Sequence, residues 1–175
     1  VVDLKWTGVS DATSGVKDIA VSFNNGDFSP VTVSASGIKT QDISALKTGI
    51  YPAKLKVTDQ AGTSVTVQAN VYIDRSQPTL KDAKIQPADW TSQKSVELAW
   101  TEAKDDGSGI ASVSYAIDHG SYASLSANEN DVKNIDVSAC ADGEHVMTVK
   151  VTDCMGYTVE REIPFYIDRT PPVLQ

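Results

Sequence analysis

The stretch VYIDRSQPTL at residues 71–80 returns near the end of the chain as FYIDRTPPVL at residues 165–174. Tyr72 and Tyr166 are 94 positions apart, and the same offset aligns other segments without an insertion or deletion. Thus LKWTGVSDATSGV (4–16) lies over LAWTEAKDDGSGI (98–110), and KVTDQAG (56–62) lies over KVTDCMG (150–156). Roughly a third of the aligned positions are identical, which indicates a tandem duplication of one small domain.

Apolar and polar residues alternate along most of both copies, which is the pattern of half-buried β-strands. In SVELAWT (95–101) Val96, Leu98 and Trp100 alternate with polar or small residues, and Trp6 stands at the matching inward position of the first copy. Turn residues cluster between the strands, as in NNGD (24–27) and ADG (141–143). We found no convincing apolar stripe at helical spacing. Short strands with turns every ten residues or so predict two antiparallel β-sandwiches in a row.

The repeat also predicts where the domains lie. We expect repeat 1 at residues 1–80, with a linker at 74–80, and repeat 2 at residues 81–175. Val1 aligns with Ser95, so the first copy has no counterpart of KDAKIQPADWTSQK (81–94), and its sandwich should lack the opening strand and leave a sheet edge bare. Because the final TPPVLQ aligns with SQPTLK, both ends look like cuts through a longer array.

Charge and hydropathy exclude several classes of partner. The formal net charge is −8, whereas nucleic acids and anionic membrane surfaces require clustered Lys and Arg. No apolar run approaches the roughly 20 residues needed to span a bilayer, and no signal segment opens the chain. We therefore expect neither nucleic-acid binding nor membrane insertion by this sequence.

The order of these motifs resembles the bacterial immunoglobulin-like (Big-type) repeats of secreted and cell-surface proteins. The resemblance covers nearly all of the chain: a strand with Trp, then D-x-x-S-G-[VI], K-V-T-D-x-x-G and a closing Y-I-D-R-[ST]-x-P. It implies immunoglobulin-like sandwiches in an extracellular, secreted or surface-attached polypeptide. It also implies a stalk, spacer or adhesive role, with further repeats of the same polypeptide, or a host or matrix protein or glycan, as partners. The alternative is a carbohydrate- or protein-binding accessory module of a secreted enzyme.

No catalytic constellation is visible in the sequence. The two histidines, His119 and His145, lie in no recognisable motif, and we expect both at exposed turn or strand-start positions. The stretch DDGSGI (105–110) has the glycines of a phosphate-binding loop but lacks its setting between a strand and a helix, so we interpret it as a tight turn. We predict that the chain is not an enzyme.

Three aromatic residues are candidates for binding. Trp90, Tyr122 and Tyr157 fall in or beside predicted turns, where an exposed ring can stack on a sugar or contact a partner protein. The alternative is that each ring covers the open end of its own sandwich.

The two cysteines are predicted not to form a disulfide. A strand at about residues 144–152 separates Cys140 from Cys154 and should hold them roughly 30 Å apart. Bridged cysteines need Cα atoms within about 7 Å. Cys140 should be a small buried residue and Cys154 the more exposed thiol.

The repeated YIDR motif suggests a role at the junction between repeats. Chain direction in such a sandwich should bring Asp74 of the linker beside Asp105, Asp106 and Asp153, which lie in turns at the end of the next repeat where the chain enters it. Four carboxylates repel each other unless they are neutralised. Calcium at these four residues is one solution, and a fork of Arg75 onto one aspartate is the other. Calcium is the one cofactor that the sequence suggests. In either case we expect a fixed, elongated arrangement, with Pro78 restricting the linker and Asp168 preparing the next junction.

Overall fold

The computed structural model describes residues 1–174, and every regular element in that range is a β-strand. The chain divides into two compact units, Val1–Arg75 and Ser76–Gln175, each of which is a β-sandwich. The predicted all-β fold of two tandem immunoglobulin-like antiparallel sandwiches is therefore confirmed. No helix of the described residues has the length and apolarity needed to cross a membrane.

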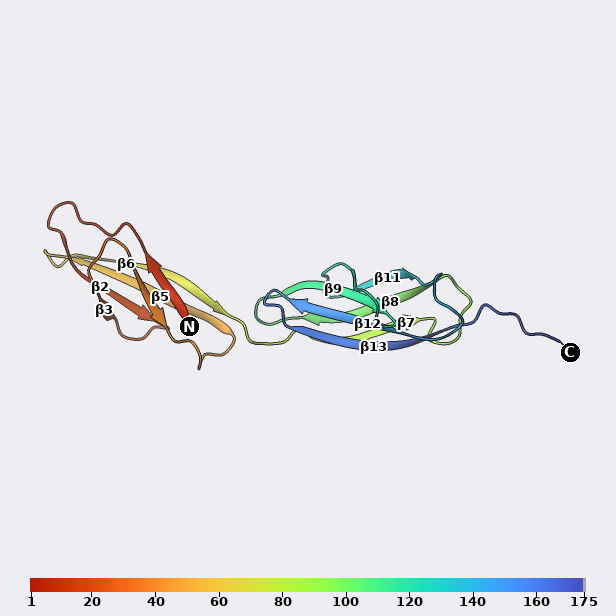
Figure 1. Ribbon diagram of the computed structural model, residues 1–175. Helices are drawn as coiled ribbons and strands as arrows, with labels where there is room; N and C mark the ends of the chain where they lie inside the picture. Colours follow the sequence, from red (N-terminus) through yellow and green to blue (C-terminus); the bar gives the residue numbers. More distant parts are fainter. Residues whose placement is uncertain (175) are drawn as a thin grey trace. The chain divides into compact units, whose positions relative to one another are not determined.

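The second unit is a complete sandwich of seven strands (Figure 1). A three-stranded sheet has the order β11-β8-β7, and a four-stranded sheet has the order β10-β9-β12-β13. The strands are β7 (Thr79–Gln86), β8 (Ser95–Lys104), β9 (Ile110–Ile117), β10 (Ala123–Ser124), β11 (Asp131–Asp136), β12 (Gly143–Asp153) and β13 (Thr158–Ile167). All pairings within these sheets are antiparallel.

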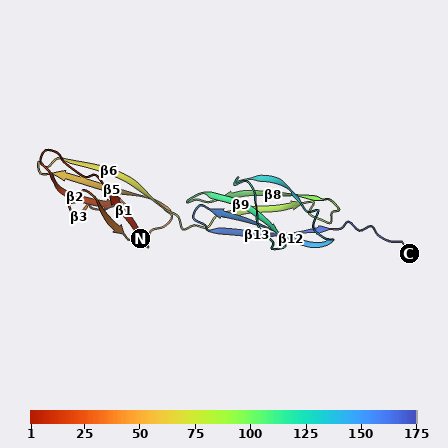
Figure 2. The ribbon, with the colours of Figure 1, turned by 45° about the horizontal axis from the view of Figure 1, so that its top comes forward.

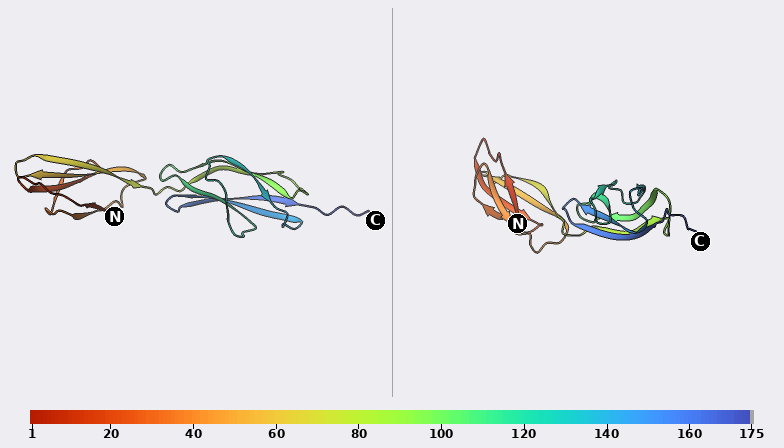
Figure 3. Two further views of the ribbon diagram at one scale, coloured as in Figure 1. Left: turned by 90° about the horizontal axis from the view of Figure 1, so that it is seen from above. Right: turned by 45° about the vertical axis from the view of Figure 1, so that its right-hand side comes forward.

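The core of the second unit lies between its two sheets, which appear as separate layers in Figure 3. Alternation along β8 sends Val96, Leu98 and Trp100 inward, where each is almost fully buried, while Glu97 and Thr101 remain exposed. The central strand β12 contributes three fully buried side chains from the opposite sheet, Met147, Val149 and Val151. The alternating pattern in the sequence thus places the apolar side chains of both sheets in one core.

The first unit repeats this architecture with six strands (Figure 2). The strands are β1 (Val2–Trp6), β2 (Val16–Phe23), β3 (Ser29–Val31), β4 (Gly37–Gln41), β5 (Gly49–Asp59) and β6 (Ser64–Ile73). They form a two-stranded sheet, β1-β4, and a four-stranded sheet, β3-β2-β5-β6. Strands β2, β5 and β6 lie 94 residues before β9, β12 and β13 with the same bounds. The register is also shared, since Val2 pairs with Gln41 as Val96 pairs with Ile135.

Within residues 1–75 no strand stands where β7 stands in the second unit, as the repeat alignment predicts. In the second unit β8 pairs with β11 on one edge and with β7 on the other. Its counterpart β1 pairs with β4 alone. The other edge of β1 therefore carries main-chain groups that no strand of the first unit pairs with.

The boundary between the units lies earlier than expected. The second unit begins at Ser76, and β7 begins at Thr79, whereas the sequence analysis placed the start of the second repeat at residue 81. Thr79 and Leu80 pair with Lys104 and Ala103 of β8, so they already belong to the second sandwich.

Both cysteines are free, as predicted. They lie at opposite ends of β12, Cys140 before the strand and Cys154 after it. Cys154 is exposed, whereas Cys140 is half-buried rather than fully buried and packs against the edge of the core.

Candidate functional site

The turn after β8 holds the first acidic residue of the candidate site. Asp105 Oδ2 accepts hydrogen bonds from Gly107 N and Gly109 N, both at 2.9 Å. Gly109 has a φ of 81°, a backbone conformation that residues with a Cβ atom adopt only with strain. This geometry confirms that DDGSGI is a tight turn. The other carboxylate oxygen, Asp105 Oδ1, is buried and has no hydrogen-bond partner among the described residues.

The second acidic residue, Asp153, ends β12. Its Oδ1 accepts hydrogen bonds from Met155 N at 2.8 Å and from Tyr157 N at 2.9 Å. The residue is 1% exposed, and its Oδ2 also lacks a partner in the part of the chain that the structure describes. The hydrogen bond from Cys154 N to Gly109 O, 3.0 Å, joins this turn to the turn after β8.

The two aspartates form one site at one end of the second sandwich. A carboxylate oxygen of Asp105 and one of Asp153 lie within 4.8 Å of each other. Each carboxylate has one oxygen fixed by main-chain donors and one buried oxygen without a donor. Buried carboxylates are unfavourable unless paired or bound to a cation, and calcium prefers oxygen ligands of this kind. The donor set therefore fits a hard cation such as calcium.

The predicted calcium site includes two further residues, Asp106 and Asp74. Asp106 is exposed, adjacent to Asp105 in the same turn. Asp74 belongs to the first unit, where its Oδ1 lies 3.4 Å from the Thr48 hydroxyl. Their participation in a metal site stays a prediction.

The first unit carries the equivalent aspartates, Asp11 and Asp59, beside an open pocket. This pocket has a volume of about 200 Å³ and is lined by both residues together with the polar residues Ser10, Thr63 and Ser64. Asp11 Oδ2 accepts three main-chain hydrogen bonds, and those from Gly15, Ser14 and Thr13 lower the pKa of the Asp11 carboxyl below its ordinary value. The same two-carboxylate arrangement is thus present in both copies, but both carboxylates are half-buried in the first and Asp153 is buried in the second.

The arginines of the repeated YIDR motif have a role that the sequence analysis did not assign. Arg75 donates to three main-chain carbonyls of the turn before β5, those of Ile43, Ser44 and Leu46, at 2.6–2.8 Å. Arg169 makes the equivalent contacts to Val137 O and Cys140 O, at 3.0 and 2.8 Å, and adds one to Gln93 O.

These contacts replace the expected fork of Arg75 onto an aspartate. A planar guanidinium suits several carbonyls that converge on one point, and each arginine fastens the last residues of its own sandwich to an earlier turn. The repetition of Arg in the motif was the available signal for this role, but its acceptors are main-chain atoms that no residue type reveals.

The three candidate aromatic residues are exposed but do not form one cluster. Trp90 is 58% exposed, and its ring centre lies 5.2 Å from that of Tyr166. Tyr122 donates to Glu160 Oε1 at 2.9 Å, and Lys150 Nζ lies 3.8 Å from its ring centre. Glu160 and Tyr166 lie six positions apart on β13, roughly 20 Å along the strand. Tyr157 lies in the turn before β13.

One of the two histidines is more buried than the sequence predicted. His119 occupies an exposed turn, with a φ of 57°, as expected. His145 was expected to be exposed, but its side chain is 11% exposed and stacks on Phe165 of β13 with 5.3 Å between ring centres. Its Nδ1 lies 2.7 Å from Asp118 Oδ2, and its Nε2 lies 2.9 Å from Ala141 O.

Both ring nitrogens of His145 thus face acceptors, which favours the imidazolium. Burial opposes the charged ring, but the bonds to Ala141 O and the Asp118 carboxylate outweigh it and raise the pKa of His145 above its ordinary value. The first copy indicates the same contact for this position. Tyr51 stands where His145 stands in the second copy, and it donates to Lys47 O, the equivalent of Ala141 O. The two hydrogen bonds and the stacking on Phe165 hold the imidazole against β13.

Comparisons with known proteins give only distant similarities. No family model matches the sequence, and no curated protein matches it. Among solved structures, the chain is similar to the fibronectin(III)-like modules of CbhA from Clostridium thermocellum, with 15% identity and a TM-score of 0.44 over 94% of this chain and 85% of that one. It is also similar to a 1.5-MDa bacterial ice-binding adhesin, with 20% identity and a TM-score of 0.48 over 95% of this chain and 57% of that one.

A third similarity is to a Bacteroides ovatus protein of a mixed-linkage glucan utilization locus, SGBP-B, solved with a mixed-linkage heptasaccharide. The identity is 12% and the TM-score 0.27, over 86% of this chain and 36% of that one. Since these scores are low and no family model matches, the resemblance to Big-type repeats stays a prediction.

Proposed function

We propose that this chain is a non-catalytic spacer or adhesive module of a larger bacterial extracellular or cell-surface protein. The observation that carries the proposal is that one sandwich occurs twice with the same strand bounds and register, and that each copy closes with the same arginine contacts. An arginine that ties the outgoing segment to its own sandwich gives each copy the same exit, which suits serial connection of repeats.

Calcium binding is part of the proposed function. Two buried carboxylate oxygens without donors, on turns joined by a main-chain hydrogen bond, support a cation at Asp105 and Asp153. Calcium takes six to eight oxygen ligands, and the two buried carboxylate oxygens supply only two of them. We assign the remaining positions to Asp74 and Asp106, to turn carbonyls and to water. Asp74 stands two positions before Ser76, where the second unit begins, which makes it the natural additional carboxylate.

Calorimetric titration of the whole chain with calcium tests this site. We expect a saturable heat that is lost in Asp153→Asn and reduced in Asp74→Ala. The matched control is Asp59→Asn, which changes the equivalent residue of the first unit and should leave the heat at the second unit unchanged. The absence of heat in the wild type at millimolar calcium would refute calcium binding. It would not refute the spacer role, which is tested by the dimensions of the chain in solution.

Small-angle scattering of the same samples tests the spacer role. A fixed, elongated arrangement predicts a single maximum dimension that does not change with chain concentration. A broad distribution of dimensions that calcium does not narrow would contradict a rigid spacer.

The second candidate function is carbohydrate binding by an accessory module. It is favoured by the exposed Trp90 against Tyr166, and by Tyr122, whose ring is fixed by Lys150 and Glu160. Fixed rings can stack on sugars without losing side-chain entropy. A glycan array of the wild-type chain should then show binding, and Trp90→Ala or Tyr122→Ala should remove it. The variant Tyr157→Ala tests the third exposed ring separately. A blank array for the wild-type chain would count against this candidate.

A further inference from the structure

An opening in the first unit lies at the loop between β3 and β4. It has a volume of about 600 Å³, and its lining combines the indole of Trp6 with hydroxyl side chains and one cation, Lys39. Strand β4 pairs with β1 on the side that β11 takes beside β8, whereas β7 lies on the other side of β8. The opening therefore does not arise from the absence of a strand beside β1. We call it the β3–β4 opening.

In the second unit one carboxylate, that of Asp131, holds the equivalent loop together. Its Oδ2 accepts hydrogen bonds from Ser126 Oγ and, at 2.9 Å, from Asn128 Nδ2, and it lies 3.1 Å from Lys133 Nζ. The bond from Ser126, followed by that from Val132 N, holds the pKa of the Asp131 carboxyl well below its ordinary value. The side chains around Asp131 thus form a set of donors that stabilises a carboxylate.

The first unit keeps this set of donors but lacks the carboxylate. At the 94-residue offset Gly37 stands at the position of Asp131, and Thr32, Ser34 and Lys39 stand at the positions of its three side-chain donors. Among the described residues Lys39 forms no ion pair. The Ser34 hydroxyl donates instead to a main-chain carbonyl two residues later, at 2.7 Å. One substitution between the copies thus leaves donors without their acceptor.

Gly37 also positions the aromatic wall of the opening. A Cβ atom at residue 37 would collide with the six-membered ring of Trp6, so the indole lies directly over the glycine. The ring is half-buried, and its Nε1 donates to Ser34 O at 3.4 Å. An indole offers an apolar surface to the C–H groups of a sugar ring, and hydroxyl side chains such as that of Ser36 suit the hydroxyl groups of a sugar.

We propose that the β3–β4 opening binds an acidic sugar, whose carboxylate takes the place that the Asp131 carboxylate takes in the second unit. Lys39 and the Thr32 hydroxyl bind this carboxylate, and the sugar ring lies against Trp6. The volume of about 600 Å³ falls in the range of small-molecule sites and exceeds what a simple carboxylate fills. The proposal goes beyond the functions proposed above, because it uses neither the calcium ligands nor the three exposed rings assigned there.

Titration of the whole chain with D-glucuronate and with D-glucose, followed by NMR, tests the proposal, because the carboxylate distinguishes the two sugars. We expect glucuronate to shift the indole N–H signal of Trp6 and the amide signals of residues 32–39. Glucose should bind about 10-fold more weakly, the usual effect of losing a hydrogen bond between charged groups. Amide signals of residues 126–133 should not shift, because Asp131 already occupies the equivalent place.

Three outcomes of this titration would overturn the proposal. The absence of a saturable shift with glucuronate would exclude the site. Equal affinities for glucuronate and glucose would exclude the role of the carboxylate. Equal affinities for glucuronate and propionate, which has a carboxylate but no sugar ring, would exclude the sugar as the ligand.

Two variants test the donors directly. Lys39→Gln should weaken glucuronate binding about 10-fold and leave glucose binding unchanged. The matched control is Lys5→Gln: Lys5 pairs with Ile38, whereas Lys39 pairs with Leu4, so the two lysines lie on opposite faces of one sheet. Gly37→Asp supplies the carboxylate of the second unit and should abolish glucuronate binding. If contact with Trp6 prevents this variant from folding, Lys39→Gln decides, and unchanged glucuronate affinity in Lys39→Gln would contradict the proposal.

Discussion

At the scale of single residues, the Asp118–His145 pair shows how one substitution between copies introduces a titratable contact. Tyr51 and His145 hold the same position, and both face the carbonyl of the preceding turn. Only His145 has a carboxylate on its other side, since Asn24 replaces Asp118 in the first copy. For Asp118, burial opposes the charged form, but the bonds from Val146 N and His145 keep the pKa of the carboxyl below its ordinary value.

The pair makes the stability of the second unit depend on pH. Because the pKa of His145 is raised on folding, its contribution is fully present below the unfolded pKa of 6.5 and is lost as pH rises through the folded value. We expect urea unfolding between about pH 5 and pH 9 to show that the second unit of the wild type loses stability as pH rises, and that the His145→Tyr variant does not. Equal pH profiles for both proteins would contradict the assignment.

The two thiols should differ in reactivity. Burial, together with nearby Asp118, raises the pKa of the Cys140 thiol, and a smaller thiolate fraction slows its reaction. A thiol reagent should therefore modify the exposed Cys154 first and Cys140 more slowly in the native protein. Cys154→Ser should leave only the slow phase, and full unfolding without reductant should release two thiols. Recovery of fewer than two would indicate a disulfide.

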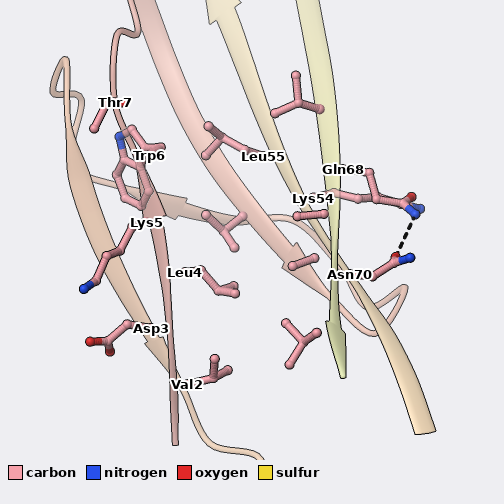
Figure 4. Close-up of a pocket in the computed structure, with 15 residues that line it drawn as sticks. Val2, Asp3, Leu4, Lys5, Trp6, Thr7, Lys54, Leu55, Gln68 and Asn70 are labelled. Atoms are coloured by element: carbon pink, nitrogen blue, oxygen red, sulfur yellow. Dashed lines mark hydrogen bonds between the residues drawn. The ribbon is translucent and has the colours of Figure 1, made fainter. Parts of the chain in front are cut away.

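At the scale of elements, the presence or absence of β7 decides how well the facing strand is packed. Trp100 on β8 is covered by β7 and is fully buried, whereas Trp6 on β1 is half-buried and lines an apolar opening of about 460 Å³ beside β1, β5 and β6 (Figure 4). The indole nitrogens make equivalent contacts, to Asn128 O at 3.0 Å and to Ser34 O at 3.4 Å. Equivalent residues thus have different surroundings because one strand is missing.

Alanine substitution at the two tryptophans should measure this difference. Trp100→Ala should lower the free energy of unfolding of the second unit by about 3–5 kcal/mol, the usual result of a large cavity in a closed core. Trp6→Ala should lower that of the first unit by a clearly smaller amount, because Trp6 already borders solvent. The measurement is chemical denaturation followed by hydrogen exchange in each unit, and equal losses would contradict the difference in burial between the two tryptophans.

At the scale of the whole chain, the two units should not be equally stable. The second has a continuous buried cluster that includes side chains from both sheets, whereas only Ile19, Val21, Ala53 and Ile73 are buried apolar residues among those described in the first. Less buried apolar area means a smaller hydrophobic contribution to folding.

We therefore expect two unfolding transitions, with the first unit unfolding at the lower denaturant concentration. Ile19→Ala and Val113→Ala are a matched pair, since the residues occupy equivalent buried positions. The first should shift only the early transition and the second only the late one, as followed by hydrogen exchange. A single transition that both variants shift would mean that the units unfold together.

The sequence by itself determined the repeat, the β-class, the missing opening strand and the free cysteines. These follow from local patterns, since alternation assigns inward faces and a fixed offset transfers strand positions from one copy to the other. Only the tertiary structure decided where the second unit starts and which main-chain carbonyls Arg75 and Arg169 contact. It also decided that His145 is buried and that one carboxylate oxygen each of Asp105 and Asp153 has no hydrogen-bond donor among the described residues. Each of these depends on main-chain atoms or burial contributed by residues far away in the sequence, and residue type does not encode which carbonyl or turn a side chain will meet.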